Sequence, residues 1–141
     1  MSVSDDGRIV VLSQNGKLLE FKKEWKILEF GEDEVFDFDI FQNKIAFSNS
    51  SGLYVSQEKG LLKIDSLAPK KLRFFQREIF ALGNNETRVY SDLWELKRLI
   101  EKNFQDLFRT ENEFIALDSD RNLCVGNGRN FRLISNKNGL P

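Results

Sequence analysis

Short apolar segments alternate with short polar connectors along the whole chain. The clearest segment is Val35–Phe41, "VFDFDIF", in which apolar residues alternate with aspartates at a period of two. This period is that of a β-strand, whose successive side chains point to opposite faces of a sheet, and it does not fit a helix. Three similar segments follow, "KIAFS", "GLYVS" and "GLLKID", separated by the turn-type connectors "QN", "NSS" and "QEK". The pattern predicts four short strands joined as one meander.

Other segments are apolar without interruption, such as "IVVL" at Ile9–Leu12 and "IFAL" at Ile79–Leu82. Uninterrupted apolar strands are expected where both faces of a sheet are covered. We therefore predict meander sheets that pack against further sheets on both sides.

The chain repeats this pattern with a period of 35 residues. "REIFALGNN" at 77–85 returns as "NEFIALDSD" at 112–120. A column of small residues shares the period: Val11, Ala46, Ala81 and Ala116. Two apolar columns share it as well: Leu61, Leu96 and Phe131, and Ile64, Leu99 and Ile134. The sequence thus predicts four repeats in a single domain spanning 1–141, with approximate bounds 1–31, 32–66, 67–102 and 103–141.

Four-stranded meanders that repeat and cover one another are the blades of a β-propeller. We therefore predict an all-β fold of the propeller type, either a partial ring or a four-bladed ring completed by another chain. Blades crowd one another near the propeller axis, so we place the column of small residues at inner positions facing a neighbouring blade. An open end exposes strand edges and apolar faces, which soluble proteins normally cover, and this favours assembly with another chain.

One segment favours a different fold class. Ser91–Phe108 has apolar residues at helical spacing, and Asp92 and Glu95 are spaced as in a capping box at its start. These apolar residues are Leu93, Leu96, Ile100, Phe104 and Leu107. The segment "KLLEFKKEWKIL" is similarly ambiguous. An α+β fold is therefore the alternative prediction.

Charge and composition exclude several classes of function. Lys and Arg total 21 and Asp and Glu total 22, so no global field attracts nucleic acid or anionic lipid. The chain has no histidine, which removes the commonest general base and a common metal ligand. Its single cysteine, Cys124, rules out an intramolecular disulfide and a multi-cysteine metal site, and we interpret it as a buried, inert thiol.

The N-terminal segment has acids where a signal peptide needs bases, and its apolar run is too short to cross a membrane. We predict a protein of the cytoplasm or nucleus that is not secreted, does not enter a membrane and is not an enzyme. No cofactor and no metal site are predicted.

The last repeat, "DRNLCVGNGRNFRLISNKNGLP", resembles the repeats of two-component-regulator-type propellers. In those repeats an Asp-x-Asn-Leu-Trp-Val-Gly stretch precedes a short strand, and a Gly-Leu-Pro turn opens the next blade. "SSGLYVSQEKGLLKID" has a similar layout, whereas Cys124 stands where the family has tryptophan. The layout is also similar to that of WD-repeat propellers, without their Gly-His and Trp-Asp signatures. The resemblance implies a blade architecture and a binding surface, and it transfers no functional residue.

Three polar segments have some features of known functional sites. The acidic residues Glu32, Asp33, Glu34, Asp37 and Asp39 are interpreted as a solvated or channel-facing row in place of a catalytic pair. "DSDRN" at Asp118–Asn122 begins like a calcium loop but lacks its glycine and final glutamate, so a polar hairpin turn is favoured. "SDDGR" at Ser4–Arg8 is faintly similar to the Asp-box hairpin of sialidase-like propellers and is interpreted as a turn.

The basic segment "PKKLRFFQR" at Pro69–Arg77 mixes cations with Phe74 and Phe75, which is a possible pattern for nucleic-acid binding. The repeat register places both phenylalanines in the core, and the chain is nearly neutral, so nucleic acid is not the predicted partner.

Trp25 and Trp94 occupy equivalent places at the start of the last strand of their repeats, where the other two repeats have Lys59 and Arg129. That strand is the outermost one, so both tryptophans are candidates for contact with a partner; packing beneath the rim of the blade is the favoured interpretation. The predicted function is a non-catalytic protein–protein interaction or scaffold module within a multi-subunit assembly. The predicted partner is a second copy, in a homodimer, or another protein, in a heteromeric complex. The alternative is a propeller that binds a glycan or another small ligand.

Overall fold

The computed structural model confirms the all-β prediction. It describes residues 2–3, 8–28, 33–42, 44–57, 60–75, 77–83, 86–91, 93–100, 104–110, 112–118, 120, 122–127 and 131–134. Over these ranges the regular structure consists of strands and contains no helix. The helix-based α+β alternative is therefore wrong.

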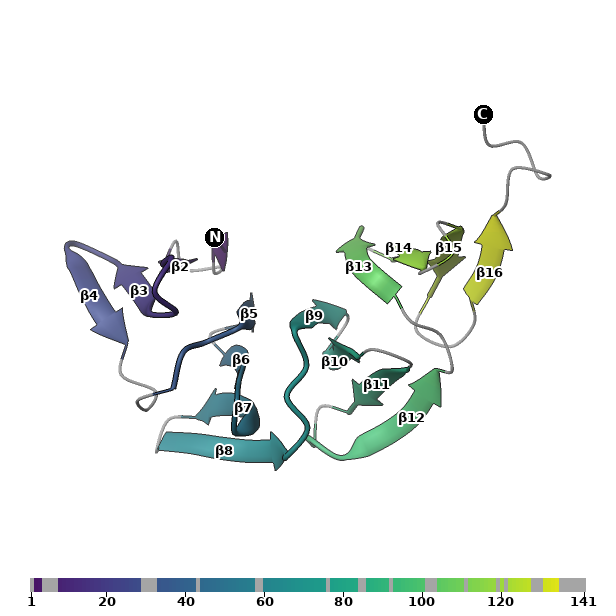
Figure 1. Cartoon of the computed structure of the whole chain (residues 1–141). Helices are drawn as coiled ribbons and strands as arrows, with labels where there is room; N and C mark the ends of the chain where they lie inside the picture. The colour runs from purple at the N-terminus through teal and green to yellow at the C-terminus, as the bar shows by residue number, and fades with distance from the viewer. Residues whose placement is uncertain are drawn as a thin grey trace. The chain divides into compact units, whose positions relative to one another are not determined.

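The described strands form four antiparallel sheets, each a meander in chain order (Figure 1). The first sheet has β1 (Ser2–Val3), β2 (Ile9–Leu12), β3 (Leu18–Phe21) and β4 (Trp25–Leu28). The second has β5 (Asp37–Phe41), β6 (Lys44–Asn49), β7 (Gly52–Gln57) and β8 (Gly60–Asp65). The third has β9 (Lys71–Phe75), β10 (Glu78–Leu82), β11 (Thr87–Tyr90) and β12 (Leu96–Ile100). The fourth has β13 (Phe104–Arg109), β14 (Phe114–Asp118), β15 (Leu123–Gly126) and β16 (Phe131–Ile134).

The segment predicted as a helix forms strands in two different sheets. Leu96–Ile100 is β12 and pairs with β11, whereas Phe104–Arg109 is β13 and pairs with β14. Helical spacing of apolar residues is a weak local preference, and pairing with neighbouring strands supplies the backbone hydrogen bonds here instead. "KLLEFKKEWKIL" likewise forms the β3–β4 hairpin.

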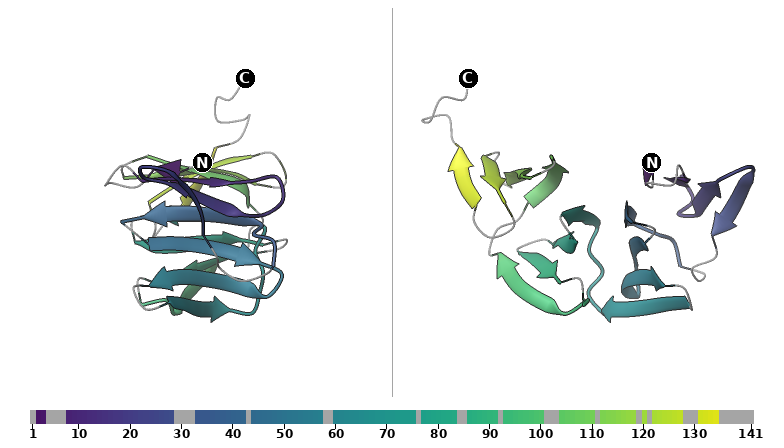
Figure 2. Two further views of the ribbon diagram at one scale, coloured as in Figure 1. Left: turned by 90° about the vertical axis from the view of Figure 1, so that its left-hand side faces the viewer. Right: turned by 180° about the vertical axis from the view of Figure 1, so that it is seen from behind.

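The chain divides into two compact units, Met1–Phe74 and Phe75–Pro141, and each is described by itself. In the first unit, the first and second sheets share one core, in which Val10 and Leu18 meet Phe38, Ile40 and Phe47. The meander of the first sheet can be followed in purple in the further views (Figure 2).

In the second unit, residues of β9–β12 and residues of β13–β16 share another core. At its centre Phe75, Phe80 and Phe114 pack edge to face, with ring centroids 5.3 to 6.0 Å apart. Such edge-to-face geometry brings the positive edge of one ring to the negative face of another. Cys124 is fully buried in this core, as predicted.

The column of small residues does not mark one structural position. Ala46 and Ala116 are both buried, and each lies on the second strand of its sheet. Ala116 belongs to the core shared with the preceding sheet. Ala46 lies between Ile45 and Phe47, which face the preceding sheet, so its own side chain points the other way. Both faces of these sheets are apolar, so alanine fits either one, and the sequence column does not determine which.

Candidate interaction surface

The first sheet has an apolar face on each side. Its register places Ile9, Phe21 and Trp25 in one cross-strand row and Val11, Leu19 and Ile27 in the next. These six side chains share one face, because residues directly opposite one another in a sheet point to the same side. We call this set the leading face. The other side carries Val10, Leu12, Leu18 and Leu28, which belong to or pack against the core of the first unit.

The leading face is accessible to solvent. Trp25 is 57% exposed and Ile27 is 56% exposed. The remaining four members are only partly buried. The ring of Trp25 lies beside that of Phe21, with centroids 5.1 Å apart. An apolar face of six side chains, with an exposed tryptophan supported by a second ring, has the composition of an interaction surface.

Trp94 differs from Trp25 in its setting. Trp25 is the first residue of β4, whereas Trp94 lies in the turn two residues before β12. Its backbone has φ of 62° and its N–H donates to the carbonyl oxygen of Ser91 at 2.9 Å. Its side chain is half-buried, so Trp94 presents less surface than Trp25. Their counterparts Lys59 and Arg129 lie outside the described residues. A binding role for either tryptophan stays a prediction.

The fourth sheet carries a second apolar face of this kind. Phe108, Ile115 and Val125 form one cross-strand row, and Leu117 and Leu123 belong to the next, which begins at Asp106. Their neighbours Leu107, Ala116 and Cys124 point to the opposite side, into the core of the second unit. Phe108 is 62% exposed and Ile115 is 38% exposed. We call Phe108, Ile115, Leu117, Leu123 and Val125 the trailing face.

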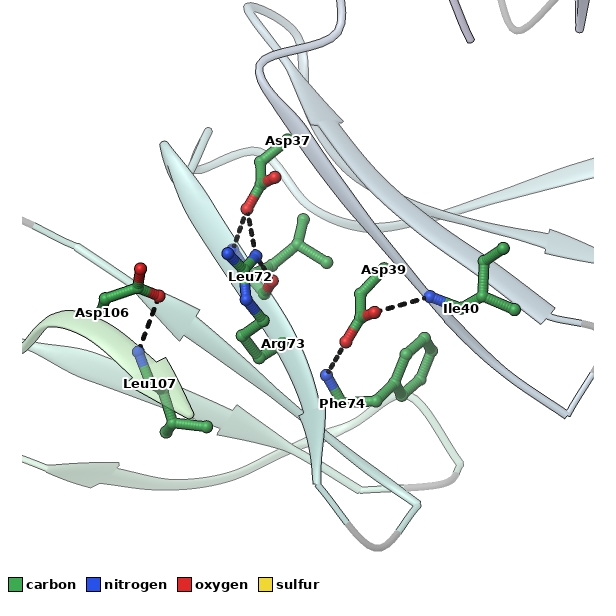
Figure 3. Close-up of polar contacts among 8 residues, drawn as sticks. All are labelled: Asp37, Asp39, Ile40, Leu72, Arg73, Phe74, Asp106 and Leu107. Atoms are coloured by element: carbon green, nitrogen blue, oxygen red, sulfur yellow. Dashed lines mark hydrogen bonds and ion pairs between the residues drawn. The ribbon is translucent and has the colours of Figure 1, made fainter. Parts of the chain in front are cut away.

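Two aspartates of β5 hold the backbone of β9, one repeat further along the chain (Figure 3). The Asp39 carboxylate accepts from the N–H of Phe74 at 2.8 Å and from the N–H of Ile40 at 2.9 Å. The Asp37 carboxylate accepts from the N–H of Leu72 at 3.0 Å. Each carboxylate thus stabilises a strand N–H that lies 35 residues ahead of it.

The prediction of a solvated or channel-facing acidic row is therefore wrong for Asp39 and holds only in part for Asp37, which is half-buried. Asp39 is only 3% exposed, and Asp37 pairs with the Arg73 guanidinium at 2.6 Å. The alternation in "VFDFDIF" identified the strand, but it did not show which face is buried; Phe36 is in fact exposed. Asp33 and Glu34 are exposed, and Glu32 lies outside the described residues.

The two phenylalanines of the basic segment are buried, and its Arg73 forms an ion pair. Phe74 and Phe75 are each 1% exposed, as predicted, so neither ring is open to a stacked base. Arg73 is engaged by Asp37 and also donates to the carbonyl oxygen of Leu72 at 2.6 Å.

The segment compared with a calcium loop is a turn between β14 and β15. One Asp118 oxygen accepts from the N–H groups of Asp120 and Asn122, each at 2.9 Å. This is the arrangement of an Asx turn, in which the carboxylate holds its own backbone.

Of "SDDGR", only Arg8 is among the described residues; it pairs with Glu20 at 3.3 Å. The part of the chain that the structure describes includes no helix able to cross a membrane.

The sequence alone does not identify the two apolar faces. The signal was present in "IVVL", "LLEF" and "WKIL", whose uninterrupted apolar character predicts cover on both sides. Only the register shows that one side of the first sheet remains accessible.

No protein-family model and no curated protein matches the sequence. Solved structures do match the fold. PorZ, a surface component of the type-IX secretion system of Porphyromonas gingivalis, gives a TM-score of 0.70 at 14% identity, over 95% of this chain and 22% of that one. YCF48 bound to a D1 peptide gives 0.68 at 13% identity, over 95% and 52%. The N-terminal domain of Nup159 gives 0.66 at 14% identity, over 99% and 46%.

The chain therefore spans about half or less of the length of these matched proteins. All three are β-propeller proteins. The four meander sheets of this chain are accordingly blades of a β-propeller fold, as the repeat predicted.

Proposed function

We propose that this protein is a non-catalytic protein–protein interaction module that serves as a scaffold within a multi-subunit assembly of the cytoplasm or nucleus. The leading face carries this proposal, because six apolar side chains with exposed Trp25 and Ile27 form a surface suited to another protein. Two propeller neighbours support the same class of function: YCF48 is bound to a D1 peptide, and the other is the N-terminal domain of the nucleoporin Nup159.

The sequence adds two arguments. The absence of histidine removes the commonest catalytic base, which supports a binding role. The resemblance of Asp120–Gly126 to the repeats of regulator-type propellers supports a rigid blade with a binding surface.

The expected result of replacing both Trp25 and Ile27 by serine is loss of partner capture. The double variant removes the two most exposed apolar side chains of the leading face, so proteins held by that face should fall at least about tenfold in a tagged pull-down quantified by mass spectrometry. Circular dichroism should show an unchanged β spectrum, because neither side chain is part of a buried core.

Leu93→Ser is the matched control. Leu93 is 75% exposed and lies in the second unit, so its replacement should leave capture unchanged. Equal capture by the wild type and the double variant would refute the leading face as the interaction surface.

A further inference from the structure

The leading and trailing faces are apolar sheet faces of the same kind as those that pack between consecutive blades inside the chain. Where two consecutive sheets of one unit meet, each contributes an apolar face to a shared core. The leading face is the side of the first sheet opposite such a core, and the trailing face is the corresponding side of the fourth sheet. Together they supply one more pair of faces of the kind that already pack inside the chain.

Asp106 also resembles Asp39, the aspartate that holds β9 inside the chain. The segment Asp106–Phe108, "DLF", matches Asp39–Phe41, "DIF", and both lie on the first strand of their sheet. The Asp106 carboxylate accepts from the N–H of Leu107 at 2.8 Å, as that of Asp39 accepts from the N–H of Ile40 (Figure 3).

The two aspartates also face the same way relative to the preceding sheet. Asp39 lies between Phe38 and Ile40, which face the preceding sheet, and Asp106 precedes Leu107, which does so as well. The Asp39 side of β5 is covered by Phe74 of β9, which belongs to the same unit: its N–H donates to Asp39, and its ring lies 5.7 Å from that of Phe41. Phe108, the counterpart of Phe41, is instead 62% exposed.

From these observations we infer that a second copy of this chain docks its leading face on the trailing face of the first. Asp106 then accepts a backbone N–H from β1 of the second copy, as Asp39 accepts one from β9. Phe108 packs against the docked blade, as Phe41 packs against Phe74. This inference rests on the proposed function and names the partner and the surface it uses.

The size of the matched folds supports two copies. This chain is covered almost entirely by its matches, yet it spans 52% of YCF48 and 46% of the Nup159 domain. Two copies therefore provide the length of one such fold. With two copies, the leading face of each meets the trailing face of the other, so both apolar faces of both chains are covered by two equal contacts.

The test uses charge variants of opposite sign on the two faces of the full chain. Variant one is Trp25→Glu with Ile27→Glu, and variant two is Phe108→Lys with Ile115→Lys. The wild type should sediment with twice the 16.4 kDa chain mass, and each variant alone should raise the dimer Kd at least about 100-fold, because charge is buried in both contacts. An equimolar mixture of the two variants should recover the dimer, since one contact is then unchanged and the other pairs acids with bases.

The mixture distinguishes this pairing from other arrangements. If the leading faces of two copies paired with each other, variant two would remain dimeric and the mixture would not rescue variant one, which would overturn the inference. A monomeric wild type at about 100 µM, or open-ended oligomers, would overturn it equally. Leu93→Glu is the control and should leave the mass unchanged.

Asp106→Ala tests the hydrogen bond separately. Loss of one charge-assisted bond in each contact should raise the Kd about tenfold, whereas Asp120→Ala, at an exposed turn position, should not change it. An unchanged Kd for Asp106→Ala would overturn its assigned role.

If the wild type is monomeric but still captures another protein through Trp25 and Ile27, this inference fails and the proposed function stands. If the wild type is dimeric but captures no other protein, this inference stands and the proposed function fails.

Discussion

Phe114→Ala should lower the free energy of unfolding by about 4 kcal/mol, the largest effect expected of any single change considered for this chain. Phe114 is 1% exposed and contacts both Phe75 and Phe80, so alanine removes a ring from the centre of the second core. The two remaining rings come from strands fixed by backbone pairing and cannot fill the space. Thermal denaturation followed by circular dichroism should show a midpoint lower by roughly 10 to 15 °C.

Phe36→Ala is the matched control because it removes the same atoms from an exposed position. Its effect should be within about 1 kcal/mol of zero. A comparable loss of stability in both variants would mean that the aromatic cluster does not stabilise the fold in the way described.

Asp39→Ala should lower the free energy of unfolding by about 3 kcal/mol. The carboxylate is 3% exposed and accepts from the N–H groups of Ile40 and Phe74. Alanine leaves both donors buried without this acceptor, and the cost of such unsatisfied groups dominates. In the variant, amide hydrogen exchange measured by NMR should increase most at Phe74, because that N–H belongs to a strand in another sheet.

Two variants make this prediction sharper. Asp39→Asn keeps the shape and one acceptor but turns an NH₂ group toward a donor, so we expect an intermediate loss of about 2 kcal/mol. Asp33→Ala removes an exposed aspartate that accepts from the Ser51 hydroxyl at 2.7 Å, and it should change stability by less than about 0.5 kcal/mol. Equal effects of Asp33→Ala and Asp39→Ala would contradict the role of burial.

The sequence was sufficient to predict the strands, the meander order and the repeat. Strand periodicity in "VFDFDIF" and the 35-residue spacing are local properties that survive folding. They also outweighed the helical spacing in Ser91–Phe108, which the structure assigns to β12 and β13.

The sequence did not allow us to predict to which face of its sheet an individual side chain points. The sequence predicts Asp37 and Asp39 in a solvated or channel-facing row because charged residues are seldom buried, yet each has a strand N–H from the next repeat as its partner. That partner becomes visible only when β5 and β9 are brought together in space. The apolar faces were hidden for the same reason, since a run such as "IVVL" looks identical whether one side or both sides are covered.

The different facing of Ala46 and Ala116 means that the repeats are not interchangeable modules. A permuted or shortened version cut at the 35-residue period would join sheets whose matched positions point in opposite directions. Any longer or shorter version of this chain has to keep β5 and β9 together, because the carboxylates of β5 hold the backbone of β9.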